Sequence, residues 1–280
     1  MEAEHLKTSP PYRISILGAG LLGRLSAWRL LEAGHRVDLY EAGAFSPSSA
    51  AAHTAAAMIS PLSEVVVSER LIYELGVRSL DLWPTWIAEL NKSLPQAPAV
   101  NYQANGSLVI AHPQDTFELE QFHRDLEGRL GQAQPSQWLG QAQIAELEPQ
   151  LSHFREGIYL PDEAHLDNRQ LLGNLLLRIK QLGGQCFEHN AIELTDIKSG
   201  KTDITADWLL DCRGLGAKQD LQSDAKQDLQ SGAEQGITSV APPSEKKFEK
   251  KSRQQNNEPI FLRGVRGEVM WVECPEVKLQ

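Results

Sequence analysis

A glycine-rich segment with the sequence GAGLLG at residues 18–23 limits the folds open to this chain more than any other feature. It follows a short apolar run and opens a stretch of helical periodicity, the order found in dinucleotide-binding β-α-β units. In such a unit Gly18 permits the tight turn, Gly20 lets the backbone approach a pyrophosphate, and Gly23 lets the helix pack closely on the strand. The segment therefore predicts a dinucleotide site at the start of an α/β fold.

The elements around this segment complete the predicted unit. Arg13–Leu17 indicates a buried strand, Leu21–Glu32 has the apolar spacing of an amphipathic helix, and residues 37–40 indicate a second strand. Glu41 follows that strand, where an acidic side chain accepts hydrogen bonds from ribose hydroxyls. An acid there disfavours the 2′-phosphate of NADP, whereas the motif alone does not separate FAD from NAD.

The middle of the chain alternates predicted helices and strands. Residues 46–61, rich in Ser and Ala, are expected to form a loop or irregular segment. Residues 62–90 are expected to be mostly helical with a break near Pro84, because proline interrupts helices. Residues 102–111 are expected to form a hairpin with Asn105-Gly106 as its turn. Further helices are predicted over Thr116–Leu130, Gln141–Leu147 and 166–182, and further strands over 186–189, 192–195 and Trp208–Asp211.

Residues 217–259 differ in composition from the rest of the chain. They begin with three copies of a degenerate octapeptide, AKQDLQSD, AKQDLQSG and AEQGITSV, and continue as a stretch rich in Lys, Glu and Gln. Such a segment has few large apolar side chains with which to offset the entropy of ordering. We therefore predict a poorly ordered, low-complexity insertion whose lysines belong to a solvated linker rather than to a binding surface.

Composition and charge exclude several classes of protein. The net charge of −10 argues against a broad nucleic-acid-binding surface, because phosphate backbones need clustered Lys and Arg. The N-terminus lacks the apolar core of a secretory signal, and the apolar run at 14–17 is far too short to span a bilayer. The three cysteines form no CxxC pair, which argues against a zinc site. We expect a cytoplasmic protein with no nucleic-acid, membrane or metal partner.

Four later segments follow the glycine-rich unit in a fixed order. They are the Ala/Ser-rich stretch 48–61, Glu148-Pro149 followed by YLP and HLD within 159–167, LLDCRGLGA at 209–217, and GVRGE at 264–268. In this order they resemble the D-amino-acid oxidase/glycine oxidase family of FAD-dependent oxidoreductases. The chain departs from the family pattern in the insertion at 217–259 and in Gly264, where the family usually has proline.

The resemblance implies an α/β fold in which a Rossmann-like FAD-binding domain is combined with a discontinuous, sheet-based substrate domain. Residues 1–60 and 150–216 would form the FAD-binding domain, and residues 61–149 and 260–280 would form part of the substrate domain. Family members continue beyond the position that corresponds to Gln280, and that part carries the arginine for the substrate carboxylate. The chain is therefore expected to be C-terminally truncated, with an incomplete substrate domain and unassigned catalytic residues.

The resemblance also assigns side chains to FAD. Met58 would lie near the isoalloxazine ring, although a methionine in the core is equally compatible with the sequence. Ser49 and Thr54 would bond phosphate or ribityl oxygens unless they cap a helix, and Arg213 would meet a phosphate or carboxylate unless it forms a surface ion pair. The expected cofactor-binding residues are Gly18, Ala19, Gly20, Leu22, Gly23, Glu41, Ser49, Thr54, Ala55, Ala57, Met58 and Gly214.

By resemblance the protein is an FAD-dependent amino-acid or amine oxidase. It would oxidise glycine, sarcosine or a small D-amino acid to the imino acid, with dioxygen as second substrate and peroxide as product. Two alternatives stay open. One is an FAD-dependent tRNA-modifying oxidoreductase, which a strongly basic face would favour, and the other is a non-catalytic, truncated remnant. The flavin content of the purified protein would distinguish a remnant from an enzyme.

Overall fold

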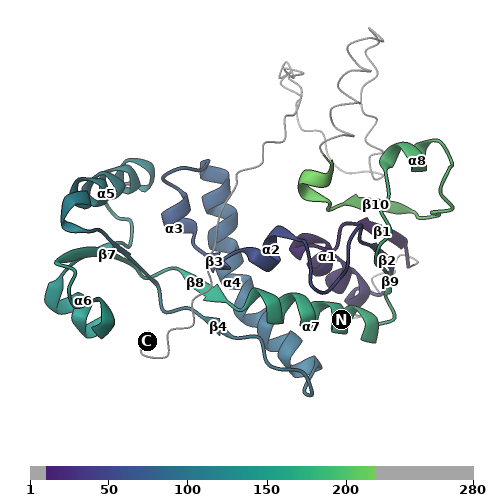
Figure 1. Ribbon diagram of the computed structural model, residues 1–280, viewed down its shortest axis with the longest axis horizontal. Coiled ribbons are helices and arrows are strands. Elements are labelled where there is room, and N and C mark those ends of the chain that lie inside the picture. The colour runs from purple at the N-terminus through teal and green to yellow at the C-terminus, as the bar shows by residue number, and fades with distance from the viewer. Residues whose placement is uncertain (1–10, 218–280) are drawn as a thin grey trace, which may run out of the picture.

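A computed structural model describes residues 11–217; apart from Ala217, the predicted segments 217–259 and 260–280 lie outside this range. One side of the molecule contains a four-stranded parallel sheet with strand order β10-β1-β2-β9 (Figure 1). Its strands are β1 Arg13–Leu17, β2 Arg36–Tyr40, β9 Gln185–Phe187 and β10 Trp208–Asp211. β1 and β2 are adjacent and parallel, with Ile14 opposite Val37, which confirms the predicted β-α-β start.

Two helices pack together against this sheet and enclose the main core. α1 (Leu21–Glu32) connects β1 to β2, and α7 (Asn168–Gln181) lies beside α1. The core that they share with the sheet includes the fully buried side chains of Ile16, Trp28 and Leu175. The apolar strands and helices predicted from the sequence thus meet where a Rossmann-like unit requires them.

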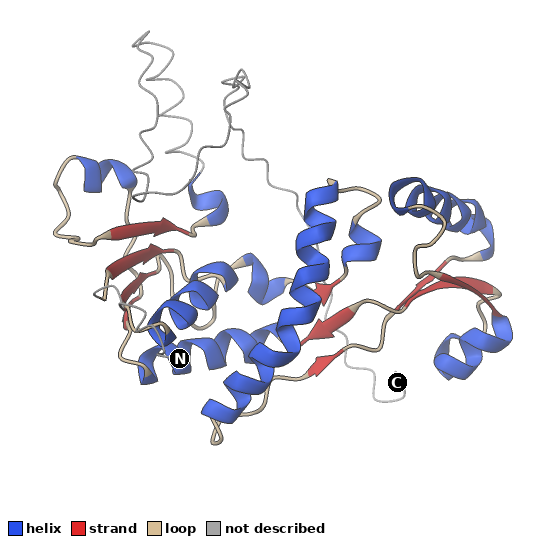
Figure 2. Cartoon of the chain, turned by 180° about the vertical axis from the view of Figure 1, so that it is seen from behind, coloured by secondary structure: helices blue, strands red, loops and turns tan. Residues whose placement is uncertain are grey.

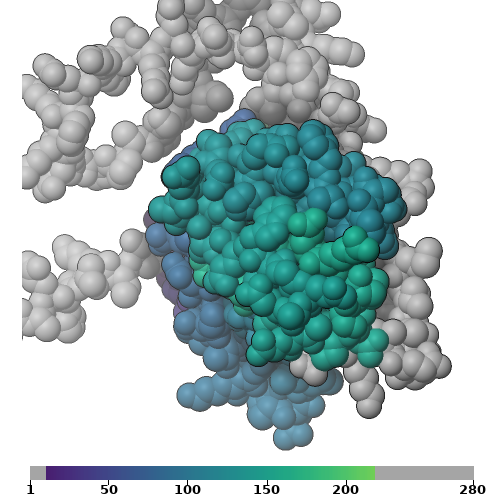
Figure 3. Space-filling view, turned by 90° about the vertical axis from the view of Figure 1, so that its left-hand side faces the viewer, coloured from purple at the N-terminus to yellow at the C-terminus, as the bar shows by residue number. Residues whose placement is uncertain are grey.

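The other side of the molecule is antiparallel. β7 (Glu156–Leu160) pairs with β5 (Ser107–Ile110) and β6 (Gln137–Gly140) in a three-stranded sheet. α5 (Thr116–Leu130) and α6 (Gln141–Leu147) begin and end at the predicted residues, and both pack against β7. Figure 3 shows the molecule from this end. The division of the chain into an FAD-binding and a substrate domain remains a prediction.

A third, short sheet lies between these two parts. It has the order β3-β8-β4 and consists of β3 Met58–Ile59, β8 Ala164–Leu166 and β4 Tyr102–Gln103. α3 (Pro61–Glu64) follows β3 and packs against the long helix α4 (Arg70–Ser93). Seen from behind in Figure 2, α4 stands between the parallel and the antiparallel sides of the molecule.

The helix α4 continues without interruption through Pro84. The predicted break there is wrong, and the helical region is interrupted instead at residues 65–69, between α3 and α4. An internal proline removes one backbone hydrogen bond. Here Trp83 and Ile87, on either side of the proline, are buried in the main core, so tertiary packing offsets that loss.

Residues 102–111 do not form the predicted hairpin. β4 pairs with β8 and β5 pairs with β7, so the Asn105-Gly106 turn carries the chain from one sheet to the other. The Gly106 N–H donates to the Glu163 carbonyl oxygen at 3.1 Å, and the Tyr159 hydroxyl donates to the Asn105 carbonyl oxygen at 2.9 Å. Distant strands thus supply the partners, and a local turn preference cannot reveal them.

Two of the shorter elements also differ from prediction. Residues 192–195, predicted as a strand, lie at the start of the short helix α8 (Leu194–Lys198), whereas 46–61, predicted to be irregular, contains α2 (Ala51–Thr54) and β3. The described part of the chain also contains the 3₁₀ helices η1 Pro113–Asp115, η2 Pro149–Leu151 and η3 Gly214–Ala217. Each of these differences lies in a segment too short for sequence periodicity to decide its conformation.

We predict that Gly106→Ala destabilises the protein more than Gly34→Ala. Both glycines have positive φ, +78° and +87°, so the two variants share the backbone cost of about 1–2 kcal/mol. A Cβ at Gly106 would lie 2.6 Å from a ring carbon of Tyr159, whereas one at Gly34, which follows the end of α1, would meet nothing within 4 Å. Overpacking should lower the free energy of unfolding of Gly106→Ala by about a further 1–3 kcal/mol in urea denaturation. Equal losses of stability in the two variants would contradict the described path of the Asn105-Gly106 turn, which leads from one sheet to the other.

Candidate cofactor-binding site

The glycine-rich loop lies at the carboxyl end of β1 and leads into α1. Gly18 has a φ of +92°, and a Cβ there would stand 2.6 Å from the Cys212 carbonyl oxygen. A Cβ on Gly23 would lie 1.9 Å from the Gly18 carbonyl oxygen. Packing within the protein therefore requires glycine at both positions, for the turn beside β10 and for the contact between helix and strand.

Gly20 differs from the other two glycines of the motif. A Cβ there would meet only the Ala50 Cβ, at an ordinary distance of 3.7 Å, and its φ of −71° suits any residue. Gly20 is the N-cap of α1, and no side chain caps this helix in the described structure. Neither packing nor backbone conformation requires glycine here, which fits a pyrophosphate that approaches the backbone and binds the helix N-terminus.

Glu41 binds the loop and also occupies the predicted ribose position. Its Oε2 accepts a hydrogen bond from the Ala19 N–H at 2.8 Å, and its Oε1 accepts one from the Gly43 N–H at 3.1 Å. Ala19 is fully buried, whereas Leu22 is 64% exposed on the first turn of α1. The carboxylate is thus oriented by two backbone donors, and its contact with a ribose hydroxyl remains a prediction.

Arg24, which the sequence did not single out, is fully buried beside the loop. Its guanidinium donates to the carbonyl oxygens of Ala19 at 2.6 Å, Leu172 at 2.7 Å and Phe45 at 3.2 Å. Burial lowers the pKa of Arg24, and the charge of Glu41 opposes that shift. The one signal available in the sequence is an arginine directly after the last glycine of the motif, on the helix face that must pack inward.

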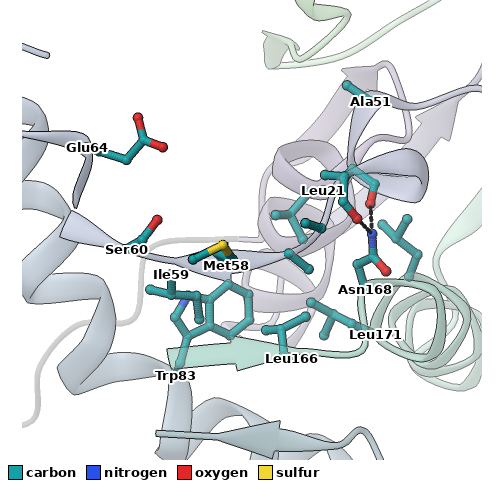
Figure 4. A pocket seen from close by; sticks show the side chains of 15 residues that line it. Leu21, Ala51, Met58, Ile59, Ser60, Glu64, Trp83, Leu166, Asn168 and Leu171 are labelled. Atoms are coloured by element: carbon teal, nitrogen blue, oxygen red, sulfur yellow. Dashed lines mark hydrogen bonds between the residues drawn. The ribbon is translucent and has the colours of Figure 1, made fainter. Parts of the chain in front are cut away.

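A cavity of about 500 Å³ opens next to the loop, between α1, α7 and residues 51–60 (Figure 4). Its wall is mostly apolar and rich in alanine. The lining includes Ala51, Ala55, Ala57, Met58, Trp83 and Leu171. Ala55, Ala57 and Met58, which were predicted to contact FAD, therefore lie together on one wall. Small side chains along such a wall leave room for a flat ring system.

The conformation of this wall is fixed by contacts from α7. Met58 is 53% exposed and lines the cavity, so the alternative of a core methionine is wrong. The preceding Ala57 has a φ of +59°, a left-handed conformation that is uncommon outside glycine. The Asn168 side-chain amide donates to the carbonyl oxygens of Ala52 and Ala55 (Figure 4). Asn168 is thus a second positioning residue that the sequence did not indicate.

Ser49 and Thr54 do not line the cavity. Both side chains are exposed, and α2 begins after Ala50 without a side-chain cap. The alternative that they cap a helix is therefore wrong. Their bonds to phosphate or ribityl oxygens remain a prediction, which requires a ligand that extends along the outer side of α2.

Arg213 and Gly214 follow β10, next to the loop. Arg213 forms ion pairs with Asp211 at 2.7 Å and Glu193 at 3.5 Å, as the ion-pair alternative predicted, although its side chain is only 12% exposed. The hydrogen bond from Arg213 holds the pKa of Asp211 below its usual value. Gly214 has a φ of +57°, and a Cβ there would meet nothing within 4 Å. Its contact with FAD stays a prediction.

A glycine-rich β-α-β unit that opens onto an apolar cavity is the arrangement of a dinucleotide-dependent oxidoreductase. The sequence pattern of the DAO family, described as FAD dependent oxidoreductase, matches residues 13–270. The chain therefore belongs to this family, and FAD is the family's cofactor. This confirms the family and the cofactor that the sequence predicted.

Two curated relatives show how much of such a protein the chain covers. A Rhizobium etli protein assigned as the thiamine biosynthesis oxidoreductase ThiO is 32% identical over 203 residues, which are 72% of this chain and 54% of the relative. The glycine oxidase of Geobacillus kaustophilus is 25% identical over 198 residues, which are 70% and 50% of the two chains. This chain thus spans about half the length of the curated relatives it matches.

Solved structures confirm the α/β fold. The crystal structure of the glycine oxidase from Geobacillus kaustophilus aligns with a TM-score of 0.54 at 23% identity, covering 64% of this chain and 47% of that one. The iminodiacetate oxidase from Chelativorans sp. BNC1 aligns with a TM-score of 0.58 at 23% identity, covering 75% and 57%. At 23% identity these two matches establish a shared fold only.

Two other features are absent from residues 11–217. No helix in that range is long and apolar enough to cross a membrane, and no three His, Cys, Asp or Glu side chains gather there as metal ligands. Cys186 and Cys212 are free, and burial raises the pKa of both thiols. A raised pKa keeps these thiols protonated at neutral pH, which makes them poor nucleophiles.

We predict that Arg24→Met lowers the free energy of unfolding by about 2–4 kcal/mol, because three buried carbonyl oxygens lose a charged donor. Arg24→Lys should restore part of the loss, since an ammonium group keeps the charge but cannot reproduce the guanidinium fork. Arg124→Met, which removes an exposed ion pair with Glu120, a hydrogen bond to Gln121 and a contact with the Phe117 ring, should cost less than about 1 kcal/mol. Urea denaturation measures all three variants. Similar losses of stability in Arg24→Met and Arg124→Met would show that Arg24 does not hold the glycine-rich loop in place.

Proposed function

We propose that this chain binds FAD at the loop 18–23 and in the adjoining cavity, as the cofactor-binding part of an oxidase for glycine, sarcosine or another small amino acid. One observation carries the proposal. Nothing in the packing of the described chain requires Gly20 to be glycine, and the helix that it opens borders the alanine-lined cavity. FAD has the matching chemistry, since its pyrophosphate needs close backbone approach and its ring needs a flat apolar wall.

Each part of the cofactor has candidate partners in this chain. The N-terminus of α1 would hold the pyrophosphate, and Glu41 would accept from the ribose hydroxyls. Ala55, Ala57 and Met58 would face the ring. The order of these residues along the site follows the order in which the parts of FAD are joined.

FAD, if bound here, would supply a two-electron acceptor for the hydride on the α-carbon of the substrate, and dioxygen would take up the two electrons to give peroxide. The protein's own residues provide the surroundings for that chemistry. Trp83 and Leu171 keep one side of the cavity apolar, and Asn168 holds the alanine-rich wall through backbone carbonyl oxygens. A fixed apolar wall excludes water and orients a bound ring before a substrate arrives.

The names of the curated relatives support an amino-acid substrate. The Geobacillus kaustophilus protein is a glycine oxidase, and the Rhizobium etli protein is assigned as an oxidoreductase of thiamine biosynthesis. A cavity of about 500 Å³ lies within the usual range for small-molecule sites. These observations favour a small substrate held beside the ring.

The FAD-binding part of the proposal predicts a selective effect of Gly20→Val. The valine side chain would enter the space of the pyrophosphate and weaken FAD binding by about ten- to a hundredfold. The free energy of unfolding of the FAD-free protein should change by no more than about 1 kcal/mol, because a Cβ at this position meets only the Ala50 Cβ, at 3.7 Å. Gly128→Val, on the exposed face of α5, is the matched control and should bind FAD normally. Quenching of flavin fluorescence measures the affinity, and wild-type affinity in Gly20→Val would contradict the proposed site.

The oxidase part predicts that the FAD-loaded oxidase to which this chain contributes the cofactor site releases peroxide with glycine, sarcosine or D-alanine. Under anaerobic conditions the same substrate should bleach the visible flavin absorbance, because the two electrons then stay on the cofactor. Bleaching without peroxide release in air would indicate a dehydrogenase. If no substrate bleaches the flavin, the proposed activity of this chain is wrong, whereas the FAD site is judged by the binding experiment alone.

A further inference from the structure

We propose that Ser60 and Glu64 form an amine-binding end of the cavity, which selects ligands with a protonated amino group. This inference rests on the proposed function, because it names the part of the substrate that the cavity would hold. In Figure 4, Ser60 and Glu64 lie at one end, Met58 lies in the middle, and Leu21 and Ala51 lie at the other end, beside the glycine-rich loop.

The two ends of the cavity differ in chemistry. At the end beside Leu21, the polar lining side chain is Asn168, and its amide nitrogen already donates to two backbone carbonyl oxygens of the wall. At the opposite end, the Ser60 hydroxyl and the Glu64 carboxylate have no hydrogen-bond or ion-pair partner among residues 11–217. These two groups are therefore free to bind a ligand.

The charge of this end indicates which ligand group it would take. Within the described part of the chain, Glu64 is the single charged side chain that lines the cavity. A carboxylate at such a position attracts a cation and repels a second anion. Glu64 and Ser60 both offer oxygen acceptors, whereas an ammonium group offers donors only, so the two sets match. The amino group is also the feature shared by glycine, sarcosine and D-amino acids.

A buried contact anchors the backbone of α3, whereas the Glu64 side chain itself is exposed. Ser60 precedes α3 and Glu64 is its last residue. Glu163, only 1% exposed, accepts hydrogen bonds at its Oε1 from the Ser63 N–H at 2.7 Å and from the Ser63 hydroxyl at 2.8 Å. α3 is thereby anchored to the link between β7 and β8. The alanine-rich wall is attached to the same region, because its last strand β3 pairs antiparallel with β8. The amine-binding end therefore keeps its position relative to that wall.

Two small probes of similar size test the proposal. Glycinamide carries an ammonium group at about pH 7, whereas glycolamide has a hydroxyl in its place. Neither has a carboxylate, so their difference in binding reports on the ammonium group. Ligand-observed NMR with the full 280-residue chain, with and without FAD, measures both affinities at about 0.15 M salt, where distant charges are screened. We expect glycinamide to bind about three- to tenfold more tightly, as for a partly exposed charge pair.

Three variants separate this end from the overall negative charge. Glu64→Gln should remove the preference for glycinamide and Ser60→Ala should reduce it. Glu118→Gln, an equal charge change on the exposed face of α5, should retain it. The preference should also decline above about pH 8, where the amine loses its proton. Equal affinities for the two probes in the wild type, or an unchanged preference in a folded Glu64→Gln, would overturn the proposal.

FAD titration of the same proteins distinguishes this proposal from the proposed function. Failure of FAD binding contradicts the proposed function. Normal FAD binding without the preference for glycinamide contradicts only the amine-binding end.

Discussion

The geometry of the cofactor site depends on how closely α1 approaches β1. A single methyl group on Gly23 would stand 1.9 Å from the Gly18 carbonyl oxygen, so no larger residue permits this contact. The contact determines where the N-terminus of α1 lies, and Arg24 secures it by donating to three backbone carbonyl oxygens. The loop, α7 and the segment after β2 are thereby held as one unit by interactions within the protein.

The parts of the fold that could be predicted are those whose determinants lie close together in the sequence. The strand, glycine-rich turn, helix and second strand are encoded within residues 13–41, and periodicity with glycine chemistry is enough to identify them. Two of the failed predictions depend on long-range partners. The Asn105-Gly106 turn joins two sheets because distant strands pair with its flanks, and α4 continues through Pro84 because the core holds both sides.

The same distinction applies to the candidate site. Glycine roles, the position of Glu41 and the alanine-rich segment follow from the motif and from the order of segments along the chain. Arg24 and Asn168 could not be predicted in this way, because they act on carbonyl oxygens 148 residues away at Leu172 and 116 residues away at Ala52. The sequence places Arg24 on the inward face of its helix, but it does not identify the partner of either side chain, since that partner is a backbone atom that every residue has.

The two antiparallel sheets are connected by a pair of short links, residues 104–106 and 161–163. The links are joined to each other, because the Gly106 N–H donates to the Glu163 carbonyl oxygen at 3.1 Å. Two joined links resist twisting between the sheets more strongly than a single extended strand would. The outer sheet β5-β7-β6 and the cavity wall that contains β3 therefore move together. A ligand that enters the cavity therefore meets a surface whose shape already exists, and little of its binding energy is lost in ordering the protein.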